Sequence, residues 1–162
     1  MGSLLAVDVG LRFGLAWFDQ AGRLHRYRSQ HVPNRGVLRR AARAALDEEP
    51  DVAVLVLEGG GAIADLWRSL AEGRGLRVLQ ISAEDWREEL LLRRERRSGQ
   101  AAKQTADGLA RRLIEECGAK RPTSLRHDAA EAILAGAWAV RRLGWEAAAA
   151  PDGPIPPPAP TS

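Results

Sequence analysis

The feature that most constrains the fold of this sequence is an uninterrupted apolar run, DVAVLVLE at residues 51–58, that ends on an acidic residue. A strand with no polar face must be covered on both sides, which is typical of a central strand in a sheet that has helices on each face. A second apolar run, SLLAVDVG at residues 3–10, also contains a carboxylate. The sequence therefore predicts a layered α/β domain whose central strands carry Asp8 and Glu58.

The neighbouring segments predict the order of the elements. GLAWFDQ and RLHRYRSQHV alternate apolar and polar residues around the turn QAG, so they extend the first strand into an antiparallel meander of three strands. Helical spacing predicts helices over residues 37–49 and 62–73, and LRVLQIS at 76–82 is a further buried strand. The order is βββαβαβ, and the crossover helix returns the fourth strand beside the first.

Three helices are predicted after the last strand. Ser82 begins a capping-box pattern, S-x-x-D, so the first of these helices starts there and is expected to end near Ser98. The second is predicted over residues 100–117. Thr123 or Ser124 is predicted to cap the third, which contains the segment RHDAAEAIL.

Composition limits the class of protein. Of the 162 residues, 45% are hydrophobic and 28% are charged, and no apolar run approaches the roughly 20 residues needed to span a bilayer. The start, MGSLLAVDVG, has no basic leader, so no signal peptide is expected. A single cysteine, Cys117, favours a reducing, cytoplasmic setting. We expect one domain over residues 1–146 and a disordered, proline-rich tail over residues 147–162.

Four carboxylates are expected to meet where the central strands end. Because the first and fourth strands are neighbours, Asp8 and Glu58 can occupy adjacent positions. Asp128 and Glu131 share one helix face with His127, since these residues are three and four apart. Without lysine partners the carboxylates repel one another unless divalent cations bind them, and oxygen ligands suit Mg²⁺ or Mn²⁺. For each acid taken alone an alternative stays open: Asp8 could cap the turn at Gly10, Glu58 could lie in water just past the sheet, and Asp128 and Glu131 could form a solvated helix face.

A cluster of arginines lies before the helix at residues 100–117. Lys103 and Lys120 are the only lysines in the chain, and every other basic residue apart from the histidines is arginine. Such a cluster is typical of a phosphate-binding patch, although a basic helix end is the alternative. The clustered residues are Arg87, Arg93, Arg94, Arg96 and Arg97.

Four segments resemble, in order and spacing, the motifs of RuvC-type Holliday-junction resolvases of the RNase H-like nuclease superfamily. They are LLAVDVGLRFGLAWFD, VLVLEGGG, SAEDWREELLLRRERRSGQAAKQTADGLARRL and HDAAEAILAG, and they span roughly residues 4 to 140. The resemblance implies an RNase H-like α/β fold, in which a mixed five-stranded sheet, an antiparallel meander plus parallel strands, is flanked by helices.

The resemblance also implies an activity. It implies a metal-dependent endonuclease that cleaves branched, Holliday-junction-like DNA, with two Mg²⁺ or Mn²⁺ ions per site. It implies Lys103 as a contact to the DNA backbone, and the basic cluster predicts that Arg93, Arg94, Arg96 and Arg97 also contact phosphates. It implies a homodimer, because resolving a junction requires two active sites. No membrane partner is expected. The implied catalytic and metal-binding residues are Asp8, Glu58, Asp128 and Glu131.

The sequence departs from the family pattern in three places. The last acidic position is Glu131, where the family has an aspartate, and glycine replaces an aromatic residue that follows the second acid. The helical region after Glu58, which builds the dimer in the resolvases, is shorter. Nuclease chemistry is therefore better supported than junction specificity.

Several alternatives stay open from the sequence. One is a YqgF-type RNase H-like nuclease that acts on RNA, and another is a nucleic-acid-binding domain of the same fold without chemistry. The hairpin DVGLRFG also resembles a phosphate-binding hairpin of sugar kinases, whose fold needs a second lobe that this chain is too short to supply. His127 could be a general base, an extra metal ligand or a phosphate contact, or simply a partly exposed residue at a helix start.

Overall fold

The computed structural model describes residues 2–91 and 99–145 of the chain. None of the helices in these ranges is both long and apolar enough to cross a membrane. The elements are β1 (Ser3–Asp8), β2 (Arg12–Phe18), β3 (Leu24–His31), α1 (Arg35–Glu48), β4 (Val52–Glu58), α2 (Gly61–Glu72), β5 (Arg77–Ile81), α3 (Ala83–Leu90), α4 (Gly99–Cys117) and α5 (His127–Arg142).

The five strands form one mixed sheet in the order β3-β2-β1-β4-β5. Strands β1, β2 and β3 are the antiparallel meander, and β4 lies parallel to both β1 and β5. The mixed five-stranded sheet predicted from the sequence is confirmed. In the register of the two central strands, Asp8 is the direct neighbour of Glu58.

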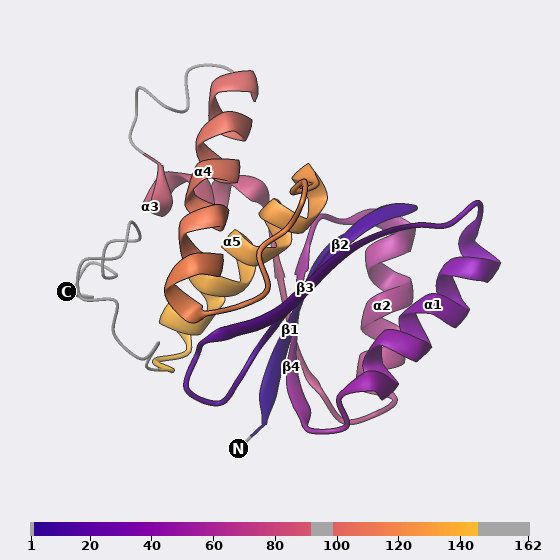
Figure 1. The fold of residues 1–162 in the computed structure, drawn as a ribbon. Coiled ribbons are helices and arrows are strands. Elements are labelled where there is room, and N and C mark those ends of the chain that lie inside the picture. Colours follow the sequence, from indigo (N-terminus) through magenta and orange to yellow (C-terminus); the bar gives the residue numbers. More distant parts are fainter. Residues whose placement is uncertain (1, 92–98, 146–162) are drawn as a thin grey trace.

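Helices cover both faces of the sheet (Figure 1). Helices α1 and α2 pack on one face, and α5, with α3 and α4 beside it, packs on the other. Successive residues of β1 therefore enter different cores: Leu5 and Val7 pack with Trp67 of α2, whereas Leu4 and Ala6 pack with residues of α5. This two-sided burial explains why the central strands are apolar without alternation.

Helix α5 packs closely against the sheet because two glycines, which have no side chain, leave room at the contact. A Cβ atom on Gly14 of β2 would lie 1.9 Å from the carbonyl oxygen of Asp128, and one on Gly136 would lie 2.2 Å from the ring of Phe18. Gly14 is also the register partner of Asp8. The contact at Gly14 thus holds the first turn of α5 directly beside the end of β1.

We expect Gly14→Ala to destabilise the protein by about 1–3 kcal/mol or more, because the new methyl group must push α5 away from β2. Urea unfolding measures this change. Gly108→Ala is the matched control: Gly108 lies in α4 with open space around a new Cβ, so alanine should be neutral or stabilise by about 0.5–1 kcal/mol. Equal unfolding midpoints for the two variants would contradict the close approach of α5.

Two helix boundaries predicted from the sequence are wrong. The capping box at Ser82 and Asp85 is confirmed, but α3 ends at Leu90 rather than near Ser98. Leu91 takes an extended conformation, and both Leu90 and Leu91 are buried. Leaving the helix at this point allows two consecutive leucines to reach the core, which adjacent positions on one helix do poorly.

The start of α5 is also later than predicted. Arg126, not Thr123 or Ser124, is its N-cap residue, and its side chain makes no capping hydrogen bond. Asp128 stands in the first turn, where a carboxylate interacts favourably with the positive end of the helix dipole. Thr123 and Ser124 lie instead in the exposed connection between α4 and α5.

Candidate active site

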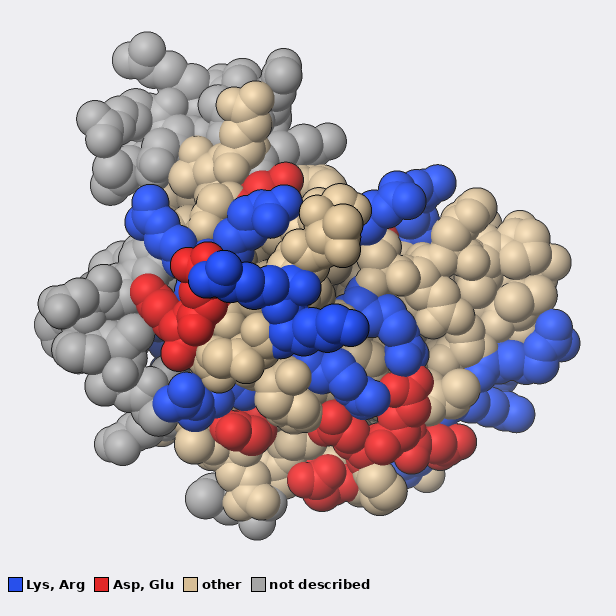
Figure 2. All heavy atoms as spheres, in the orientation of Figure 1, with Lys and Arg blue, Asp and Glu red and all other residues tan. Residues whose placement is uncertain are grey.

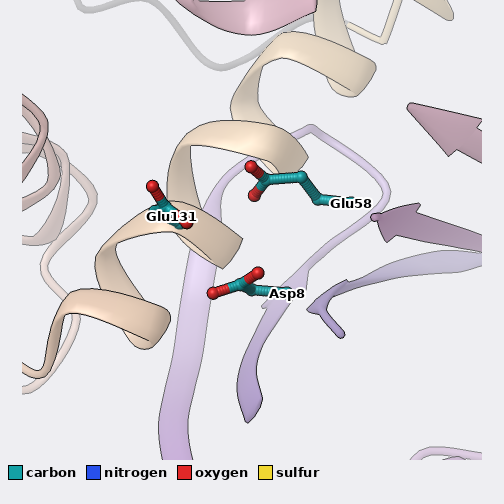
Figure 3. Close-up of side chains that lie close together, drawn as sticks. All are labelled: Asp8, Glu58 and Glu131. Atoms are coloured by element: carbon teal, nitrogen blue, oxygen red, sulfur yellow. The ribbon is translucent and has the colours of Figure 1, made fainter. Parts of the chain in front are cut away.

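Three carboxylates from separate elements converge at the C-terminal ends of the central strands (Figure 3). Asp8 and Glu58 end the adjacent parallel strands β1 and β4, and α5 places Glu131 across them. One carboxylate oxygen of each residue lies within 4.8 Å of the others. Glu58 is 4% exposed and Glu131 8% exposed, so the cluster is largely withdrawn from water.

The fourth predicted acid, Asp128, is buried beside this cluster but is not among the three residues whose carboxylate oxygens lie within 4.8 Å of one another. Its Oδ2 atom accepts a hydrogen bond of 2.6 Å from the hydroxyl of Ser29 on β3. Its negative charge nevertheless contributes to raising the pKa of Asp8, so the two carboxylates are close enough to repel. The structure therefore brings together three of the four predicted acids and holds the fourth at their edge by a hydrogen bond.

The cluster raises the pKa values of two of its carboxylic acids. Burial, followed by the negative charges of Glu58, Glu131 and Asp128, raises the pKa of Asp8 to about 9. Burial and the charge of Glu131 raise the pKa of Glu58 to about 8, although the nearby Trp86 indole and Arg87 guanidinium act in the opposite direction. At neutral pH the protein alone thus favours protonated, uncharged forms of these two acids.

Two cationic or ionisable groups contact the same oxygen of Glu131. Arg87 of α3 donates from Nη2 to Oε1 of Glu131 at 2.8 Å, and Nε2 of His127 lies 3.0 Å from that oxygen. On its other side, Nδ1 of His127 lies 3.6 Å from Oδ1 of Asp107 on α4. Arg87 offsets part of the charge of Glu131, while the carboxylates of Asp8 and Glu58 have no ion pair among the described residues.

The donor set fits a hard divalent cation. Oε2 of Glu58 is buried and has no hydrogen-bond partner among the described residues. A buried carboxylate oxygen without a donor is costly, and a cation between Glu58, Asp8 and Glu131 would satisfy it. Carboxylate oxygens alone, with no thiolate, are the ligands that suit Mg²⁺ and Mn²⁺.

Three residues have roles at the site that the sequence analysis does not predict. Arg87, which belongs to the predicted basic cluster, pairs with Glu131. Ser29 contacts Asp128, and Asp107 lies near His127. Alternation along β3 could have placed Ser29 on the face that α5 covers, as it does Tyr27. The predicted phosphate contacts Arg93, Arg94, Arg96 and Arg97, and the side chain of Lys103, lie outside the described residues.

No family model matches the chain, and no curated protein matches it. Several solved structures match it over most of its length. RuvC from T. thermophilus in complex with a Holliday junction substrate superposes with a TM-score of 0.62 at 13% identity, over 89% of this chain and 97% of that one. RuvC from Thermus thermophilus in a second structure gives 0.60 at 17% identity, over 88% and 97%. Fowlpox virus resolvase bound to Holliday junction DNA gives 0.54 at 14% identity, over 70% and 76%.

These similarities establish the class of fold. The chain has an RNase H-like fold, a mixed sheet with helices on both faces, and the arrangement of its elements is similar to that of RuvC. The fold predicted from the four motifs is thereby confirmed over most of the chain.

Proposed function

We propose that this protein is a metal-dependent nuclease that hydrolyses phosphodiester bonds in branched, junction-like DNA. One observation carries the proposal: three buried carboxylates converge at the ends of two central strands, and one of their oxygens has no partner among the described residues. The RuvC-type fold supports it, because the similar structures include two resolvases bound to Holliday junction DNA.

Each acid has a role in this proposal. Asp8 and Glu58, fixed side by side by the register of β1 and β4, would hold the cation from the sheet. Glu131 would hold it from α5, and Asp128, oriented by Ser29, would complete the set. Bound Mg²⁺ or Mn²⁺ would supply charge neutralisation, activation of water for in-line attack on phosphorus and stabilisation of the leaving oxygen. Two ions per site would divide these tasks between them.

The remaining groups position these acids. Arg87 and His127 both contact Oε1 of Glu131 and so restrict the direction of its carboxylate. We propose that the arginines from Arg93 to Arg97 and Lys103 bind DNA phosphates, and that two copies of the chain act on one junction. Arginine's planar guanidinium suits phosphate, and cleaving a four-way junction symmetrically needs two active sites.

A panel of substrates tests the proposed function. The purified protein is incubated with a labelled four-way junction, a flap, a duplex and single-stranded RNA, each with Mg²⁺, Mn²⁺ or EDTA. We expect metal-dependent cleavage of the junction in preference to the duplex. Cleavage of RNA alone would instead favour the YqgF-type alternative, and absence of any cleavage would contradict the nuclease.

Glu131 provides a prediction about the choice of metal. It reaches one methylene further than the aspartate that the RuvC-type motif has at this position, so its carboxylate is displaced by about one C–C bond length. Mg²⁺ requires near-ideal geometry at about 2.0–2.1 Å, whereas Mn²⁺ also accepts imidazole, and His127 lies next to Glu131. We expect higher activity with Mn²⁺ than with Mg²⁺, and a shift toward Mg²⁺ in Glu131→Asp.

Cleavage rates of both proteins at matched concentrations of the two metals measure this preference. The His127→Gln variant separates the two causes, because it removes the imidazole and leaves the length of Glu131 unchanged. Equal ratios of the Mn²⁺ rate to the Mg²⁺ rate in wild type and Glu131→Asp would show that Glu131 does not determine the choice.

A further inference from the structure

Lys and Arg side chains form a band across the face of the molecule that carries β3 and the connection between α4 and α5 (Figure 2). Within this region Arg111 of α4, Lys120 of the connection and Arg126 before α5 are exposed. None of these three forms an ion pair with a residue that the structure describes. We call these three residues, with the hollow beside Tyr27, the connection surface.

Neighbouring cations differ from these three because acids already neutralise them. Arg26 and Arg28 on β3 pair with Glu48, at 2.9 and 2.6 Å, near the end of α1. Arg121 of the connection pairs with Glu115 at 3.2 Å. The connection surface therefore retains positive charge for which the described part of the chain offers no counterpart.

The connection surface has a defined shape. A hollow of about 400 Å³ lies between β3 and the connection, and Tyr27, Lys120, Thr123 and Ser124 are among its lining residues. The hydroxyl of Tyr27 donates a hydrogen bond to the carbonyl of Lys120 and so ties the connection to the strand. Arg111 is near enough to Tyr27 to lower the pKa of its hydroxyl, although burial raises that pKa more. Of the three cations, Lys120 lines this depression together with the hydroxyls of Thr123 and Ser124, and cations and hydroxyl donors are the groups that bind phosphate oxygens.

The connection surface is joined to the acidic site by the chain itself. Arg126 immediately precedes His127 and Asp128, the first residues of α5. On β3, Ser29 is two residues from Tyr27 and donates its hydroxyl to Asp128. A strand of nucleic acid placed at the acids can therefore continue over β3 and the connection, where positive charge offsets the repulsion that the carboxylates exert on phosphates.

We propose that the connection surface binds phosphate groups of the nucleic-acid strand that enters the acidic site, on one side of the bond to be cleaved. The proposal rests on the proposed function and adds residues other than the arginines proposed above as phosphate contacts. Because these groups would contact phosphates and not base edges, their contribution is independent of base sequence.

Two triple variants with the same change in net charge test the proposal. One is Arg111→Gln, Lys120→Gln, Arg126→Gln. The matched control is Arg39→Gln, Arg40→Gln, Arg43→Gln, which removes three exposed arginines from α1 on the opposite side of the sheet. Binding to a labelled four-way junction is measured by fluorescence anisotropy in EDTA over a series of salt concentrations, and circular dichroism verifies that both variants are folded.

For the first variant we expect binding to weaken at least tenfold near 0.1 M salt. The slope of log K against log salt should decrease by about 2–3, since each lost phosphate contact removes about 0.9. The α1 variant should keep a slope near that of wild type. Equal loss in both variants, an unchanged slope in the first, or no nucleic-acid binding by wild type would each overturn the proposal. Because this assay contains no metal, it measures binding independently of cleavage. A wild-type protein that binds the junction here but does not cleave it in the panel with Mg²⁺ or Mn²⁺ would contradict only the nuclease function.

Discussion

Asp8→Asn is expected to reduce cleavage by more than about 100-fold, which exceeds the usual cost of losing a residue that only orients a metal ligand. Asp8 lies at the centre of the cluster: the charges of Glu58, Glu131 and Asp128 all act on it, and its backbone is fixed between β2 and β4. An amide offers one neutral oxygen in place of a charged carboxylate. Cleavage of a four-way junction by the purified variant measures the loss.

The same variant should fold well and bind DNA normally. Removing a buried carboxylate relieves both desolvation and repulsion, so the melting temperature in EDTA should match or exceed that of wild type. Asp65→Asn is the matched control, because Asp65 is exposed on α2 and the chemical change is identical. Near-wild-type cleavage by Asp8→Asn would disprove the assignment of the active site.

Without metal, the contribution of Asp8 and Glu58 to the stability of the protein is expected to fall as the pH rises from about 4 to about 9. The folded-state pKa values of Asp8 and Glu58 are raised to about 9 and about 8, whereas in an unfolded chain such groups titrate near pH 4. The folded state therefore binds more protons over this interval, and stability decreases with pH wherever that is so. Their contribution is complete below about pH 4 and is lost as the pH passes through the folded values.

Thermal unfolding in EDTA at pH 5, 7 and 9 measures this dependence. Asp8→Asn should show a shallower decline than wild type, because one of the two groups no longer titrates. Adding Mg²⁺ or Mn²⁺ at pH 8 should raise the melting temperature of the wild-type protein, since a cation replaces the protons between the carboxylates. Parallel pH profiles for wild type and Asp8→Asn, with no effect of metal on either, would contradict the electrostatic description of the site.

Much of the sheet could be predicted because strands that are buried on both faces have continuously apolar sequences. The apolar runs at β1 and β4 predicted such strands, and the crossover between them placed Asp8 and Glu58 close together. Their direct pairing in the register is confirmed. Glu131 could likewise be placed with His127, because helical spacing alone brings the two residues together.

What sequence reasoning missed depends on contacts between elements far apart in the chain. Arg87 pairs with Glu131 across 44 residues, and Ser29 reaches Asp128 across 99 residues. No periodicity or local pattern in the sequence predicts either contact. The early end of α3 has a similar origin, because the burial of Leu90 and Leu91 in the tertiary core overrides a helix-forming sequence.

Calorimetric titration of Mn²⁺ into the protein tests the central claim most directly, because it measures cation binding at the acidic cluster without any substrate. Wild type and Asp65→Asn are predicted to bind Mn²⁺ saturably and with equal affinity, and Asp8→Asn is predicted to lose that binding. Retention of wild-type Mn²⁺ affinity by Asp8→Asn would contradict the assignment of Asp8, Glu58 and Glu131 as the metal-binding site.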